Sequence, residues 1–91
     1  MIKASDNVFV DLGFDAEEAE NLKLRAQLMA ELVRHMQQHE LNQAQASQRF
    51  GLTQPQVSAL ARGRVKQFSI DRLVNALARV GEHVSIRVER R

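Results

Sequence analysis

The chain has 91 residues, which is the length of one small domain. Hydrophobic residues make up 44% of it, but no apolar run approaches the roughly 20 residues that a membrane-spanning helix needs. The absence of cysteine excludes disulfides and thiolate chemistry, and the absence of Trp and Tyr disfavours stacking on single-stranded nucleic acid. Because the N-terminus also lacks the apolar stretch of a secretory signal, we expect a cytoplasmic protein.

Charge is unevenly distributed along the chain, although the net charge is only +2. Residues 1–21 hold one lysine and six acidic residues, whereas residues 41–70 hold four basic residues and no acidic one. This segregation favours two surfaces with different partners, one of which is polyanionic.

Four segments begin with the same pattern, in which an apolar residue precedes a helix-capping residue and a second apolar residue follows five positions after the first. Phe14, Asp15 and Ala19 form the first example, and Glu18 completes a capping box. Glycines follow the last three segments, where they can take the left-handed conformation that ends a helix. The patterns predict helices at about 15–39, 42–50, 54–61 and 70–80.

The end of the chain, HVSIRVERR, changes to a period of two. Val84, Ile86 and Val88 alternate with polar residues, which predicts a β-strand. One strand cannot satisfy its own backbone groups, so it needs a partner. We favour the same strand of a second copy in a two-fold dimer, and pairing with NVFV at residues 7–10 is the alternative.

The predicted fold is therefore mainly all-α, a bundle of four to five helices with a short C-terminal strand. It divides into an N-terminal arm at 1–14, a helical domain at 15–81 and a dimerisation strand at 82–91.

Residues 42–62 have the spacing of a helix-turn-helix. Small residues, Ala46 and Ser47, fall where the two helices must cross closely, and Gly51 falls at the turn. An alanine is usual in place of Ser47, so we expect its hydroxyl to bond back to a carbonyl of its own helix.

The second helix of the motif has a short, polar outer face. We predict that Val57, Leu60 and Ala61 point inward. The outward side chains would then be Gln54, Pro55, Ser58, Ala59 and Arg62. Glutamine can bond two atoms of adenine in the major groove, serine can bond several bases, and arginine can bond guanine or phosphate. Arg62 could equally cap the carbonyls that end its own helix.

Residues on either side of this face would bind the DNA backbone. Gln43 begins the preceding helix, where its amide and the free N–H groups would meet a phosphate. Arg64 and Lys66 would neutralise phosphates from the following loop. The complete set of predicted DNA-binding residues is Gln43, Thr53, Gln54, Gln56, Ser58, Arg62, Arg64 and Lys66.

The stretch QAQASQRFGLTQPQVSALARG resembles the λ-repressor-like (XRE) DNA-binding domains, and the resemblance covers residues from about 22 to 80. It implies that Gln43 and Gln54 support each other at a phosphate and a base, and that Ser58 faces bases. The flanks, NVFVDLGFDAEEAENLKLRAQL and GRVKQFSIDRLVNALARVGEHVSIRV, resemble the short antitoxins of the HigA type. Such proteins usually dimerise, repress their own operator and neutralise a RelE-like ribonuclease toxin encoded beside them, so the resemblance implies an antitoxin.

The acidic N-terminal segment is a hypothetical toxin-binding arm. Its apolar anchors would be Val8, Phe9, Val10 and Phe14, and its acids would attract a basic nuclease. The simpler interpretation is a helix start whose acids complement the helix dipole. Two alternative functions remain: a phage-type XRE regulator with no toxin, and a toxin-binding module without specific DNA binding.

His35 and His39 are four residues apart, a spacing that can hold zinc. No third ligand is evident beyond Glu31 or Glu40, so we expect two exposed, inert histidines and no metal. The sequence contains neither a catalytic-triad pattern nor a phosphate-binding glycine loop. We therefore expect no cofactor and no enzymatic activity.

Overall fold

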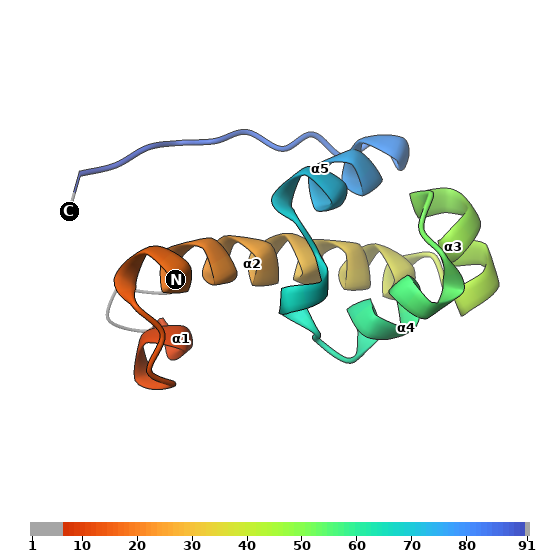
Figure 1. Ribbon diagram of the computed structural model, residues 1–91. Helices are drawn as coiled ribbons and strands as arrows, with labels where there is room; N and C mark the ends of the chain where they lie inside the picture. Colours follow the sequence, from red (N-terminus) through yellow and green to blue (C-terminus); the bar gives the residue numbers. More distant parts are fainter. Residues whose placement is uncertain (1–6, 91) are drawn as a thin grey trace.

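The computed structural model describes residues 7–90, which form a helical domain around one long central helix (Figure 1). In chain order the described elements are α1 (Val8–Asp11), α2 (Ala16–Gln38), α3 (Gln43–Phe50), α4 (Gln54–Ala61), the 3-10 helix η2 (Val65–Gln67) and α5 (Ile70–Arg79). The four predicted helices are confirmed, with ends within one residue of the predicted ones. None of the described helices has the length and apolar character to cross a membrane.

The helix starts are fixed locally, as the capping patterns predicted. Each of the helices α2 to α5 begins after a residue whose side chain accepts a backbone N–H three positions on, namely Asp15, Asn42, Thr53 and Ser69. In α3 and α4 the capping box is complete, because the Gln45 and Gln56 side chains accept the N–H groups of Asn42 and Thr53 in return.

The core lies where α2 meets the other helices. Helix α2 contacts α1, α4, η2 and α5, so neighbours surround it on more than one side. The largest fully buried side chains are Phe50, Phe68, Leu22, Leu32, Leu60, Leu73, Leu77 and Val57. Because all of them except Phe68 come from α2 and the later α-helices, and Phe68 directly follows η2, this core fixes α3 and α4 relative to the rest of the domain.

The segment NVFV is helical, so its predicted alternative pairing with the C-terminal strand is wrong. Asn7 explains the difference, because its side chain caps α1 by accepting the N–H of Phe9 at 3.0 Å. The same side chain is buried and donates from Nδ2 to the carbonyl of Ala19 in α2 at 3.1 Å. From Asn7 onward the predicted arm is therefore packed on the domain; residues 1–6 of it lie outside the described residues.

The C-terminal segment forms no strand within residues 82–90, and Arg91 lies outside the described residues. It leaves α5 and runs back as an extended chain along the side of the molecule (Figure 1). Val84 packs against the core, but Ile86 and Val88 are 82% and 92% exposed. A strand requires a pairing partner, and none of the other segments within residues 7–90 forms a backbone hydrogen bond with residues 83–90. The strand and its pairing across a dimer therefore stay predictions.

His35 is buried, contrary to the prediction of two exposed histidines. Its ring packs edge-on against Phe50 at 5.9 Å and lies 4.2 Å from the ring of His39, which is exposed. Nδ1 of His35 has no hydrogen-bond partner in the described chain, and the nearest carboxylate oxygen, on Glu82, is 3.9 Å away. Burial, and then the nearby charge of His39, lower the pKa of His35, while Glu82 acts in the opposite direction.

The lowered pKa makes the stability of the fold depend on pH. Below the ordinary histidine pKa of 6.5 the unfolded chain binds more protons than the folded chain, so the contribution of His35 is present above pH 6.5 and is lost as the pH falls through the folded-state pKa. We expect the free energy of unfolding in urea to decrease from about pH 7.5 to about pH 5, and His35→Gln to flatten this decrease. The exposed His83→Gln serves as control and should keep the wild-type profile. An unchanged profile in His35→Gln would refute the assignment.

Candidate nucleic-acid interface

The turn between α3 and α4 is held by Ser47 and Gly51. Gly51 adopts the left-handed conformation (φ 68°), and the N–H of Leu52 donates to the Ser47 carbonyl at 3.1 Å. The Ser47 hydroxyl donates across the turn to the Leu52 carbonyl, not to its own helix as predicted. A Cβ on Gly51 would meet the end of the flexible, exposed Arg79 side chain, which can move aside, so the left-handed backbone conformation is what favours glycine here.

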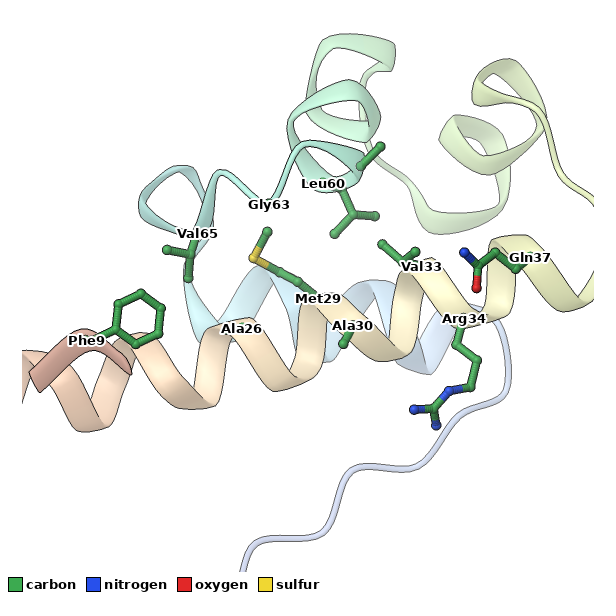
Figure 2. A pocket seen from close by; sticks show the side chains of 11 residues that line it. Phe9, Ala26, Met29, Ala30, Val33, Arg34, Gln37, Leu60, Gly63 and Val65 are labelled. Carbon is green, nitrogen blue, oxygen red and sulfur yellow. The ribbon is translucent and has the colours of Figure 1, made fainter. Parts of the chain in front are cut away.

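Val57 and Leu60 anchor helix α4 in the core, as predicted. The predicted positions of its two alanines are wrong, because Ala61 was expected to point inward and Ala59 outward. Ala59 is buried in the core, whereas Ala61 is exposed. Ala61 lines an open groove of about 490 Å³. The groove lies between α2 and the chain after α4, with Met29 and Val33 on one side and Leu60 and Gly63 on the other (Figure 2). Beside Ala59 the chain turns back, and the N–H of Arg64 donates to the Ala59 carbonyl at 3.0 Å.

Gln54, Ser58 and Arg62 form the outer side of α4, and we call these three residues the recognition face. They are four positions apart and therefore share one side of the helix. Gln54 and Arg62 are exposed, and Ser58 is half-buried. Their amide, hydroxyl and guanidinium groups are short or flexible hydrogen-bonding groups of the kind that meet base edges in the major groove.

The side-chain oxygens of Thr53 and Gln56 accept the hydrogen bonds of the capping box that begins α4. Oγ1 of Thr53 accepts the N–H of Gln56 at 3.2 Å, and Oε1 of Gln56 accepts the N–H of Thr53 at 2.8 Å. Only the Thr53 hydroxyl hydrogen and the Gln56 amide NH₂ remain to donate to DNA. The structure thus gives both residues a structural task that their predicted binding role did not include.

The predicted phosphate-binding residues come from the elements before and after α4 in the chain. Gln43 is the exposed first residue of α3, and the exposed Arg64 comes just before η2. Lys66 is exposed in η2, and its Nζ lies 4.7 Å from the ring centroid of Phe14, a cation–π contact. Among residues 7–90, no side-chain hydrogen bond joins Gln43 to Gln54, and none runs from the Arg62 guanidinium to a carbonyl.

The four predicted toxin-binding residues divide into two pairs. Val8 and Val10 are exposed on α1, whereas Phe9 and Phe14 are half-buried and pack edge to face at 6.1 Å. Phe9 points into the groove beside α2, toward the side where Val65 lies (Figure 2). The predicted set omits Leu12, an apolar side chain that is 68% exposed on the same short segment as Val8 and Val10. The sequence feature that could have indicated this exposure is its position directly before Gly13, where α1 ends.

The histidine pair does not extend to a metal-binding cluster. In the part of the chain that the structure describes, no group of three or more His, Cys, Asp or Glu side chains is arranged to hold a metal ion. His35 and His39 face Arg49, Arg79 and Glu82 around a shallow surface pocket.

A small helical core that holds a tight turn between two short helices, with the second helix presenting an acid-free polar side, defines a helix-turn-helix protein. A protein-family model described as a helix-turn-helix domain matches residues 8–89, nearly the whole chain. The chain belongs to this family, which places it among the DNA-binding regulators. No curated protein matches it significantly.

Proposed function

We propose that the protein is a sequence-specific transcriptional repressor that reads DNA bases with the recognition face. The observation that carries the proposal is the outer side of α4, where Gln54 and the C-cap residue Arg62 are exposed on either side of the half-buried Ser58, within a stretch of 30 residues, 41–70, that has no acidic side chain. An acid-free surface with flanking cations can approach the phosphates of a duplex without charge repulsion. Repression would follow from occupying a promoter.

We further propose that the protein acts as a cytoplasmic homodimer on a pseudo-palindromic operator. Two recognition faces about 34 Å apart would meet successive major grooves on one side of the duplex. The C-terminal segment would join the copies, because Ile86 and Val88 are exposed apolar side chains in an extended segment that makes no backbone hydrogen bond within the described residues.

The proposed biological setting is a type II toxin–antitoxin operon of the HigA kind, in which the protein represses its own promoter and neutralises a RelE-like toxin. The support is the sequence resemblance and the N-terminal surface. There, the exposed Val8, Val10 and Leu12 lie beside the acidic Asp11. A small basic protein would find both apolar contact and opposite charge on this surface.

The role of Arg64 can be measured from the salt dependence of DNA binding. Each phosphate neutralised by a cation contributes about 0.9 to the slope of log K against log salt concentration. We expect Arg64→Ala to reduce the slope for duplex DNA by about one and to weaken different sequences equally. Arg34→Ala is the matched control, because Arg34 points away from α4 and pairs with Glu31 at 2.9 Å (Figure 2). A slope unchanged in Arg64→Ala would remove this residue from the interface.

The toxin partner is tested by co-expressing the chain with the product of the reading frame next to its gene, which the proposal predicts to be a small basic protein. The proposal predicts co-purification of the two, and loss of the complex in Val8→Asp/Val10→Asp with DNA affinity retained. Specific DNA binding without any such complex would favour the phage-type regulator. A stable complex without specific DNA binding would favour the pure toxin-binding module.

A further inference from the structure

We propose that the C-terminal segments of two copies pair as antiparallel strands in one register, with Ile86 of one copy opposite Ile86 of the other. The inference rests on the dimer of the proposed function and adds the alignment of its interface. Residues 83–89 of each chain would form the two-stranded ribbon.

The C-terminal segment has one apolar side, as a strand packed on one face has. Val84, Ile86 and Val88 are two residues apart and share a side when the chain is extended. Val84 is half-buried against the core, whereas Ile86 and Val88 farther along the same side are uncovered. On the other side, Nε of Arg87 lies 3.5 Å from Oε1 of Glu89, as expected for residues two apart on one face of an extended chain.

The backbone of the segment is free to pair. The last backbone hydrogen bond runs from the N–H of Glu82 to the carbonyl of Leu77 at 3.0 Å, and residues 83–90 form none within the described chain. Ile86 and Val88 add exposed apolar side chains along the same stretch. A row of open donors and acceptors beside apolar side chains is a template for another strand.

A second copy can pair with this segment in several registers, and the register centred on Ile86 matches the side chains better than the adjacent registers do. Centring the pair on Ile86 puts Val84 opposite Val88 of the second copy, and so collects six apolar side chains on one face. On the polar face Ser85 then meets Arg87, and His83 meets Glu89, with no like charges opposed.

The neighbouring alignments each carry a penalty. Centring on Arg87 places two arginines opposite each other, and centring on Ser85 sets Val88 against Glu82. A shift by one residue pairs the apolar face of one strand with the polar face of the other. A parallel two-fold pair would set every residue opposite itself, including Arg87 and Glu89, which again opposes like charges.

Single cysteines test the register directly, because the chain contains no cysteine. On the two-fold axis the two Cα atoms would be about 4.5–5.5 Å apart, within disulfide range. We expect Ile86→Cys to form a covalent dimer almost completely under mild oxidation. Ser85→Cys and Arg87→Cys would each stay uncrosslinked alone, since like residues are then about 8 Å apart, but would crosslink with each other when mixed.

The controls distinguish a failure of the proposed register from a failure of the proposed dimer. Light scattering on the wild-type chain gives the oligomeric state, and a monomer would overturn both the dimer and the inference. A wild-type dimer in which Ile86→Cys fails to crosslink, or in which Ser85→Cys alone crosslinks equally well, would overturn the register and leave the dimer standing. DNA binding by each uncrosslinked variant would show that the domain is folded.

Discussion

Replacing Gln54 and Ser58 together with alanine is expected to lower affinity for the DNA sequence that the wild-type protein prefers by roughly thirtyfold or more. Good contacts to base edges are worth about 1–3 kcal/mol each in discrimination, so losing two costs at least about 2 kcal/mol per protomer. Affinity for unrelated duplexes should change little, because the phosphate contacts remain. Fluorescence anisotropy with both kinds of duplex measures the two effects.

The matched control is Gln38→Ala/Asn75→Ala, which removes two exposed polar side chains outside α3 and α4. It should bind both duplexes as the wild-type protein does. If Gln54→Ala/Ser58→Ala also leaves the preference for the chosen sequence intact, while circular dichroism shows a folded protein, the recognition face is misassigned.

Phe50→Ala is expected to destabilise the domain by about 3–5 kcal/mol, the range for removing a fully buried phenylalanine. Phe50 ends α3, is 1% exposed and contacts the ring of His35, so its loss opens a cavity between α2 and the helix-turn-helix. A domain of this size has only about 5–15 kcal/mol of stability in total, so DNA binding should also fail at moderate temperature.

Urea unfolding measures this effect, with Leu12→Ala as the control. Leu12 is 68% exposed, and its truncation should change the free energy of unfolding by less than about 0.5 kcal/mol. A loss below about 1 kcal/mol in Phe50→Ala would contradict the central place of this residue in the core.

The helices could be predicted because their signals are local. The side chains of Asp15, Asn42, Thr53 and Ser69 cap within three residues, so the sequence alone contains both partners of each hydrogen bond. Helix α1 was not predicted because Val8, Phe9 and Val10 are typical strand residues. Its helical state depends on Asn7, whose side chain also reaches Ala19 in another helix.

The errors at the candidate site have tertiary causes. The reversal of Ala59 and Ala61 depends on where the chain turns back after α4 and on the groove beside α2. The burial of His35 depends on Phe50, fifteen positions away. The competing tasks of Thr53 and Gln56 were visible in the sequence, because a threonine followed three positions later by a glutamine is a typical capping-box sequence, and such a box uses both side-chain oxygens.

The C-terminal strand illustrates a different limit. The alternation of Val84, Ile86 and Val88 describes a surface that needs a partner, and no residue among 7–90 brings backbone groups to it, so the proposed second chain would have to supply them. The pattern therefore predicts an assembly, whereas the single chain shows an extended segment with two exposed apolar residues.

The central claim is that α4 reads DNA sequence, and the most direct measurement is selection by the purified wild-type protein from a library of randomised duplexes. The proposal predicts enrichment of one two-fold-related sequence, bound about a thousandfold or more tightly than unselected duplex at physiological salt. It also predicts that Gln54→Ala/Ser58→Ala changes or abolishes the enriched sequence. Recovery of duplexes without a shared sequence, with equal affinity for all, would contradict the claim.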